Sequence, residues 1–508
     1  MTSASPVLLH PEIIQRDSRL ALGILLCYWI FFMLVSAALL WVIIALAGSG
    51  LPALLRWGAL LMPAGLLLHL WWTSFPRRRP APFGTPVALD SEPDLKALIE
   101  SVAHALNVPM PAEVRLLPDM NAYMSVQGGR STLGLGLPLL LSLSGAEVKA
   151  VIAHELAHVG GGDAARAWRL AGLASGMFRT ALSLRQGSPE RAVELLPQGL
   201  STAVVLYLLL GNLLALPMTA LARAYLRVSE RLNHAQEHAA DQAAERVAGA
   251  AAAHSALRRI AVEAHLFDAY VAQEVVPLAQ AGFRVPLAEG FQMFLRGEQA
   301  ERLRGWTAQD LPEREATLSH PSLRARLDRL EAPLPEDWPP AEPSSLLGQA
   351  DRWSEAFYVP ASVRALRPVL WDDLNTAHWP PHWQALSQSE TVRAALRGVT
   401  LLDVPVICAD LNAHLRVRFT QLQYEGVGGD ERHALVAWLA LGVLLAALRQ
   451  GACAHVQPGH PWAAQAHGQT LTPEPLLWQM VMQPAARAAW PDQMAALGLR
   501  DSLLLDGE

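Results

Sequence analysis

The run from Leu20 to Ala47 contains no charged residue, and this apolar stretch limits what the chain can fold into more than any other feature. About twenty apolar residues are enough for a helix to cross a bilayer. A second apolar run follows from Trp57 to Phe75, interrupted only by Pro63 and His69. The two runs predict an N-terminal transmembrane hairpin within residues 1–80. A buried hairpin of a soluble protein is the alternative, and the length of the first run disfavours it.

Arginines flank this hairpin unevenly. Arg16 and Arg19 precede it and Arg77–Arg79 follow it, whereas the intervening loop contains only Arg56. Positively charged flanks stay on the cytoplasmic side of a membrane. The pattern therefore predicts a multi-pass protein of the cell inner (plasma) membrane, with the segment after the hairpin in the cytoplasm.

The overall composition agrees with membrane segments. Charged residues make up 17% of the chain and hydrophobic residues 52%, whereas about a quarter of a soluble domain is charged. The net charge of −6 gives no sign of nucleic-acid affinity, so no nucleic-acid partner is expected. The three cysteines, Cys27, Cys408 and Cys453, are far apart and argue against a disulfide framework and a cysteine zinc site.

Residues His154 to His158 form an H-E-x-x-H motif. On a helix, His154 and His158 leave the same face one turn apart, so two neutral ring nitrogens can bind one zinc ion. Glu155 between them is placed to take a proton from water. Ser144 and Glu147 have the spacing of a capping box, and the glycines at 160–162 are typical of a helix end. A polar patch on an ordinary amphipathic helix is the alternative.

A third ligand is needed, and Glu237 is the candidate. It shares a face with Asp241 on a helix predicted from Ala222 to Ala248. Asp241 can hydrogen-bond the outer nitrogen of a ligating histidine. A solvated acidic face is the alternative. His234 and His238 form a pair of their own and are predicted to be bystanders, because a site built on them would leave the first motif without a third ligand.

In this order, the motifs resemble those of the membrane zinc metallopeptidases of the CAAX prenyl-protease and heat-shock protease HtpX type. The resemblance covers roughly residues 95–332. Tyr123 and Ser322 are mild departures, since the family has phenylalanine and a second proline there. The matching segments are Asn121-Ala122-Tyr123, Ser131 to Leu141 as edge strand and approach to the helix, His154 to His158 with Asp163, Glu237 to Asp241, and Ser319-His320-Pro321-Ser322 with Arg326 and Leu327.

The resemblance implies roles for individual residues. One zinc ion per chain would be bound by His154, His158 and Glu237. Glu155 would act as general base. An extended peptide would add to the edge strand, so cleavage would depend on local unfolding of the substrate. Further implied residues are Asp241 and Asp163 as outer partners of the ligands, His320 as a catalytic group or an ordinary turn histidine, and Asn121 and Arg326 as substrate contacts.

A second membrane pair is predicted within residues 167–222. Leu200 to Ala222 is strongly apolar, whereas Leu170 to Leu184 is weaker and contains Arg179. Because the two zinc motifs must meet on one side, this segment crosses the membrane twice or not at all. Hydropathy leaves both alternatives open, and the resemblance favours two crossings. Arg179 near mid-span would be costly unless it faces protein or water.

The predicted fold class is a mainly α membrane protein in four segments. They are the hairpin (1–80), a zincin-like α+β metallopeptidase domain with a small edge-strand sheet (81–332), a proline-rich linker (333–345) and a separate C-terminal α+β region of unassigned function (346–508). In the last segment, Thr400 to Cys408 and Leu415 to Gln423 are predicted strands. Ala434 to Leu448 is a predicted core helix, because about fifteen residues are short for a span.

The predicted function is a membrane-bound zinc endopeptidase that cleaves misfolded or membrane-associated polypeptides at the cytoplasmic face. Its partners would be polypeptide substrates and the lipid bilayer. One alternative is CAAX-type processing of a lipidated protein. The other is a non-catalytic membrane adaptor with a structural zinc site, against which Glu155 argues, because a structural site has no need of that carboxylate.

Overall fold

The computed structural model describes residues 11–75, 82–127, 129–160, 174–184, 198–310, 323–327, 345–358, 365–419 and 428–505. In this part of the chain the protein is mainly α-helical with three small sheets, as predicted. Contacts divide it into two units. The first comprises Met1–Ala261, Asp310–Trp338 and Ser344–Gly348, and the second Val262–Gln309, Pro339–Pro343 and Gln349–Glu508. The predicted segment boundaries at 80, 332 and 345 stay a prediction.

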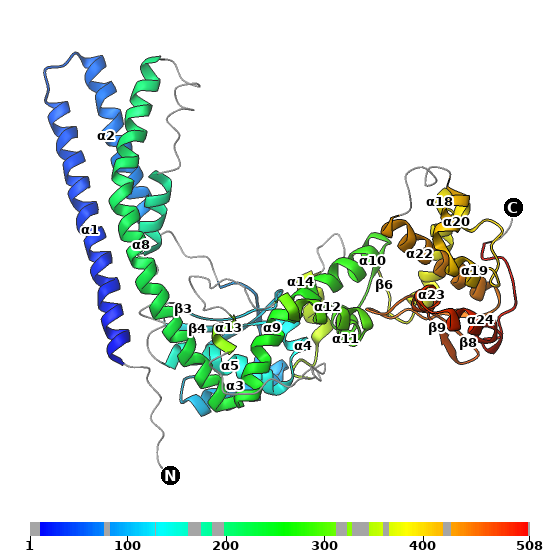
Figure 1. Cartoon of the computed structure of the whole chain (residues 1–508). Helices are drawn as coiled ribbons and strands as arrows, with labels where there is room; N and C mark the ends of the chain where they lie inside the picture. The colour runs from blue at the N-terminus through cyan, green and yellow to red at the C-terminus, as the bar shows by residue number, and fades with distance from the viewer. Residues whose placement is uncertain are drawn as a thin grey trace, which may run out of the picture. The chain divides into compact units, whose positions relative to one another are not determined.

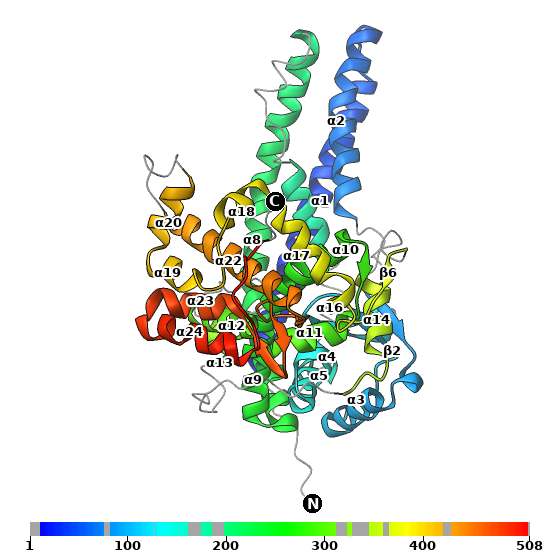
Figure 2. The same cartoon turned by 90° about the vertical axis from the view of Figure 1, so that its right-hand side faces the viewer.

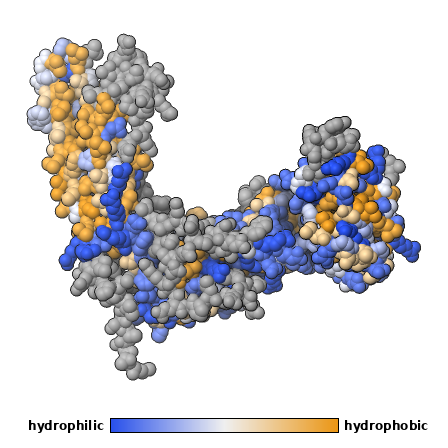
Figure 3. Space-filling model, in the orientation of Figure 1, coloured by the Kyte–Doolittle hydropathy of each residue, from blue (hydrophilic) through white to orange (hydrophobic). Residues whose placement is uncertain are grey.

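Helices α1 (Pro11–Ala47), α2 (Ala53–Ser74) and α8 (Gln198–Ala248) form an elongated bundle with residues 174–184 (Figure 1; Figure 2). Tyr28 and Phe32 of α1 are fully buried in its apolar core. The outer face is also apolar, with Trp41 and Trp72 each 70% exposed, and Figure 3 shows this belt along the helices. An apolar surface of this extent is stable when lipid covers it.

Three helices in the described residues are long and apolar enough to cross a membrane, namely Arg16–Ala47, Leu208–Ala248 and Gly429–Arg449. They indicate a membrane protein. The first is only 11% buried in its most apolar window, whereas the last is 61% buried. The last therefore packs as a core helix of the second unit, as predicted for Ala434 to Leu448. Helix α2 is not among the three, and it contains Pro63 and His69.

Residues 174–184 run antiparallel to α2. Gly176 lies against Ser74, where a Cβ atom would meet the Ser74 carbonyl oxygen at 2.0 Å, and Ser183 Oγ lies 3.0 Å from His69 Nε2. The chain then returns along α8, where the rings of Phe178 and Tyr225 are 6.2 Å apart. The prediction that residues 167–222 cross the membrane twice stays a prediction. Residues 161–173 and 185–197 lie outside the described residues.

Arg179 is partly buried and contacts backbone groups of the protein, which lowers its predicted cost. Its guanidinium donates to the carbonyl oxygens of Thr73 at 3.3 Å and Phe75 at 2.9 Å. These are carbonyl groups at the end of α2, where a helix has no partners of its own. A cation at a helix C-terminus is also electrostatically favourable.

The first unit contains a four-stranded sheet with the order β1-β2-β4-β3. The strands are β1 (Thr85–Val87), β2 (Glu113–Leu117), β3 (Ala122–Gln127) and β4 (Arg130–Gly136). Strands β2 and β4 are parallel, and the other pairs are antiparallel. The edge strands are therefore β1 and β3.

The prediction that Ser131 to Leu141 contains the edge strand is wrong. These residues form the interior strand β4 and the short helix α4 (Leu137–Ser142). Five consecutive residues at the end of β4 are buried, whereas every residue of β3 is only partly buried. The strongly apolar run belongs to the interior strand because both of its faces are covered.

The helices around the sheet begin with the 3₁₀ turn η1 (Leu89–Ser91) and α3 (Pro93–Leu106), followed by α5 (Gly145–Gly160). The predicted capping box starts α5. Ser144 N donates to Glu147 Oε2 at 2.8 Å, and Glu147 N donates to Ser144 Oγ at 3.3 Å. Glu147 also accepts from Ser255 and, at 3.0 Å, from Arg259 Nε of α9 (Ala250–Tyr270). The start of α5 is thus fixed to α9.

The second unit is also mainly helical. Its helix α11 packs on Trp371, whose indole N–H donates to Pro286 O at 2.8 Å. Its elements, besides the end of α9, are the π-helical turn η2 (Val271–Val275), α10 (Val276–Gln280), β5 (Phe283–Arg284), α11 (Leu287–Leu295), α12 (Glu298–Asp310), α14 (Ala350–Tyr358), β6 (Arg367–Pro368), α16 (Leu374–Ala377), α17 (Trp379–Ser387), α18 (Glu390–Leu396), α19 (Val404–Ala409), α20 (Leu411–Arg418), α22 (Gly429–Arg449), β7 (Cys453–Ala454), β8 (Ala464–Ala466), β9 (Gln469–Leu471), α23 (Pro473–Met482) and α24 (Pro484–Ala496).

The strands predicted at Thr400 to Cys408 and Leu415 to Gln423 are wrong where the structure describes them. Helices α19 and α20 occupy most of this region, and residues 420–427 lie outside the described part. The buried residues Val404, Ile407, Cys408, Leu411 and Leu415 have helical spacing. The Asp410 side chain caps α20 by accepting from Ala413 N at 2.9 Å.

We expect Glu147→Gln to destabilise the first unit by about 2 kcal/mol, because it removes the buried carboxylate charge that accepts from Arg259 and Ser255. Glutamine can still accept from Ser144 N, so the cap itself is kept. Thermal unfolding in detergent measures the loss. The control Glu100→Gln, on the exposed face of α3, should change the stability by less than about 0.5 kcal/mol.

This loss should depend on pH. Burial alone would raise the pKa of Glu147, but the Ser255 hydrogen bond and the Arg259 charge outweigh it and hold the pKa below its usual range. A lowered pKa contributes stability above the unfolded-state value, about 4.3, and this contribution is lost as the pH falls through the folded-state value. The gap between wild type and Glu147→Gln should therefore close below about pH 4. A gap that stays constant would contradict the ion pair.

Candidate metal centre

Helix α5 packs against α8. His154 of α5 lies next to Glu237 and Asp241 of α8, and His158, one turn further along α5, lies next to Glu237. The order of these pairs shows that the two helices run antiparallel. Residues four apart share one helix face, so each helix presents two functional side chains to the other.

The packing brings three possible metal ligands together. His154 Nε2 is 3.5 Å from Glu237 Oε2, and His158 Nε2 is 3.6 Å from Glu237 Oε1. One ligand atom from each of the three residues lies within 4.8 Å of the others, and no other such group occurs in the described residues. Glu237 is 5% exposed. Two imidazole nitrogens and a carboxylate are a donor set that suits zinc and leaves a position open.

Asp241 fixes the orientation of His154. Its Oδ1 atom lies 3.0 Å from His154 Nδ1, so this nitrogen donates and the lone pair of Nε2 is free to face the centre. Burial lowers the pKa of His154, but the hydrogen bonds with Asp241 and Glu237 outweigh it and raise the pKa to about 9. The raised pKa means that the surrounding carboxylates favour a positive charge at His154 Nε2. A bound metal ion would supply such a charge.

Arg326 completes this arrangement from α13 (Leu323–Leu327). Its guanidinium forms a bidentate pair with Asp241, with Nε 2.9 Å from Oδ2 and Nη2 2.5 Å from Oδ1. Nη1 also lies 3.5 Å from Glu237 Oε2. The positive charge compensates two carboxylates that are buried beside each other. Arg326 therefore contacts Asp241 and the possible metal ligand Glu237. Its predicted contact with substrate stays a prediction.

The other predicted site residues are placed as follows. Glu155 lies on α5 between the two histidines and is half-buried. Asn121 is exposed at the start of the edge strand, and its carbonyl accepts from Gly136 N at 2.7 Å. His238 contacts Gln242, and neither His234 nor His238 belongs to the ligand group. Asp163 and His320 lie outside the described residues.

The sequence reasoning missed the partnership between Arg326 and Asp241, which are 85 residues apart. The pairing of Glu147 with Arg259 was missed for the same reason. The sequence around an arginine does not indicate which acidic residue it pairs with in the folded protein. The one available hint was the acid itself, since a second carboxylate buried beside Glu237 requires a compensating cation.

The match with a protein family agrees with this geometry. Residues 90–334 match the model of peptidase family M48. Over these residues, the chain is similar to that family. The resemblance to membrane zinc metallopeptidases of the HtpX and CAAX-protease type is thereby confirmed. The match indicates a peptidase, a hydrolase of peptide bonds. No solved structure matches the chain.

We expect Asp241→Asn to weaken metal binding by about 10- to 100-fold, the usual loss when the outer partner of a ligating histidine is removed. The asparagine amide no longer forces His154 Nδ1 to donate, and it forms a weaker pair with Arg326. Competition for zinc with a chromogenic chelator measures the affinity. The control Asp268→Asn, exposed on α9, should bind as wild type does. If the two variants bound zinc with equal affinity, Asp241 would have no role in the metal centre.

Proposed function

We propose that the protein is a membrane-bound zinc metalloendopeptidase. The observation that carries this proposal is the cluster of His154, His158 and Glu237, with Glu155 between the two histidines on α5. Bound zinc would supply a Lewis acid that polarises a carbonyl group and makes water nucleophilic near neutral pH. Glu155 supports a catalytic centre over a structural one, because a structural site has no use for an additional carboxylate.

The residues of the chain divide the work in this proposal. Glu155 takes a proton from the attacking water and returns it to the leaving amine, as a general base and then a general acid. Asp241 holds the tautomer of His154, and Arg326 holds Asp241 in place. Asp163, and His320 as an oxyanion or orienting group, keep the roles that the family resemblance implies.

The edge strand β3 is the proposed binding site for an extended substrate. It is half-buried, pairs on one side only with β4, and lies against α5, which carries His154 and His158. An extended peptide can form main-chain hydrogen bonds with such an edge. Asn121 at its start is placed to contact the substrate backbone. Recognition through the backbone favours unfolded or locally unfolded polypeptides over one side-chain sequence.

The bundle of α1, α2 and α8 supports action at a membrane. Helix α8 runs from this bundle to Glu237 without a break. We therefore propose membrane-associated or misfolded proteins as substrates. The arginines that flank the hairpin support a plasma-membrane location with the metal centre in the cytoplasm. Processing of a lipidated protein would instead show as cleavage restricted to lipidated peptides.

We expect Glu155→Gln to keep zinc and to lose at least about 100-fold in casein hydrolysis, because general base catalysis contributes about 10²- to 10⁴-fold. Glu237→Ala should lose both zinc and activity. The measurement is zinc content and hydrolysis by detergent-purified protein, with Glu245→Gln on α8 as the control. Full activity of Glu155→Gln would refute the mechanism. Complementation of a deletion by Glu155→Gln, together with failure after removal of residues 346–508, would favour the adaptor.

Backbone recognition can be tested on the substrate. A peptide that is cleaved by the wild type is methylated at one amide nitrogen at a time. Addition to the β3 edge predicts that cleavage falls at every second position, since successive N–H groups of a strand point to opposite sides. Losses at a single position, or at none, would contradict this mode of binding.

A further inference from the structure

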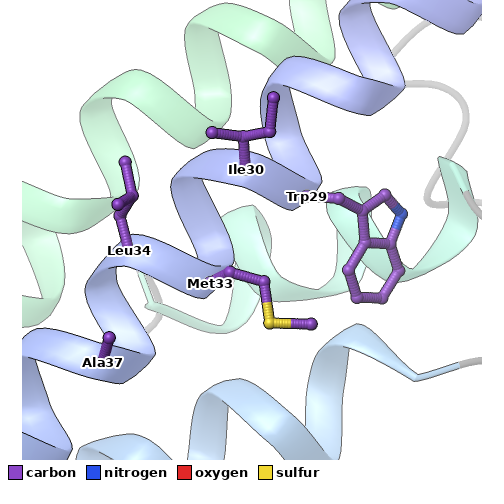
Figure 4. Close-up of a pocket in the computed structure, with 5 residues that line it drawn as sticks. All are labelled: Trp29, Ile30, Met33, Leu34 and Ala37. Carbon is purple, nitrogen blue, oxygen red and sulfur yellow. The ribbon is translucent and has the colours of Figure 1, made fainter.

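A shallow apolar groove of about 470 Å³ lies on the lipid-facing side of α1 (Figure 4). It is lined by Trp29, Ile30, Met33, Leu34 and Ala37. Eight residues of helix separate its ends, so it extends about 12 Å along α1. Its lining offers almost no polar surface, which suits a hydrocarbon chain.

The Trp29 end of the groove lies next to the end of α2. The Trp29 ring lies 5.7 Å from that of Phe75, the residue that follows α2. The Phe75 carbonyl in turn accepts from Arg179 at 2.9 Å. Trp29 and Arg179 therefore both lie next to Phe75, at one end of the apolar groove.

Arg179 brings a positive charge to that end. Its contacts are two carbonyl groups and the Ser175 hydroxyl, and no acidic side chain in the described residues forms an ion pair with it. A guanidinium has five N–H groups, so two remain for an external acceptor. Arginine binds phosphate oxygens with this geometry. The sequence adds three arginines at 77–79 and no acid before Asp90.

We propose that this groove and Arg179 form a binding site for an anionic phospholipid. The acyl chain lies along the face from Trp29 to Ala37, and the phosphate accepts from Arg179. A transmembrane helix is the less suitable occupant. Membrane helices meet through small residues, whereas Trp29 and Met33 project from this face. The inference depends on membrane insertion of α1 and not on the metal chemistry.

The test is native mass spectrometry of the full chain in detergent, with phosphatidylglycerol and phosphatidylcholine of the same acyl chains added in equal amounts. The wild type should retain phosphatidylglycerol in preference. Arg179→Gln should lower that preference by about fivefold, the loss expected for one basic residue at an anionic surface. The control Arg223→Gln, exposed on α8, should leave it unchanged.

Two further variants spare the contacts that cap α2. Trp29→Ala removes the ring that lines one end of the groove, and should weaken retention of both lipids. Met33→Trp fills the groove and should also reduce retention of both. If Arg179→Gln has lost helical content, these two variants take its place as the test of the proposal. The proposal fails if the wild type shows no preference, if Met33→Trp retains lipid as the wild type does, or if Met33→Trp changes only the oligomeric state.

Discussion

The antiparallel contact between α5 and α8 is the constraint on which the rest of the first unit depends. It places His154 and His158 against Glu237 and Asp241 and thereby buries two carboxylates beside each other. Buried acids are costly unless a cation accompanies them. Arg326 supplies one such charge, and the proposed zinc ion would supply the other. The same packing that orders the helices therefore creates a demand for a cation between them.

Other features of the unit hold these two helices in place. The capping box and the pairing of Glu147 with Arg259 fix the start of α5. The membrane bundle fixes part of α8, because one face of this helix is buried in the core that it shares with α1, α2 and residues 174–184. The buried residues are Ala215, Met218, Ala222, Tyr225 and Val228. Since α8 is continuous, the position of Glu237 is set partly by contacts inside the apolar bundle. This gives a physical link between membrane insertion and the metal centre.

Local patterns predicted much of this architecture. The apolar run at Leu20 to Ala47, the capping box and the spacing of His154 and His158 each need only neighbouring residues to act, and each is found in the structure. The strands predicted beyond residue 400 are wrong because the buried residues there, which include the β-branched Val404 and Ile407, have helical spacing. The edge strand was misplaced because sheet order depends on partners far apart in the sequence. The pair of Arg326 and Asp241 was beyond reach for the same reason.

The central claim is that one zinc ion is held by His154, His158 and Glu237. Zinc K-edge X-ray absorption of the purified chain tests it most directly, because it reports the ligand atoms independently of activity. The account predicts nitrogen and oxygen neighbours at about 2.0–2.2 Å, with histidine scattering and no sulfur, and a changed first shell in Glu237→Gln. A sulfur neighbour at about 2.3 Å, or an identical spectrum from Glu237→Gln, would contradict it.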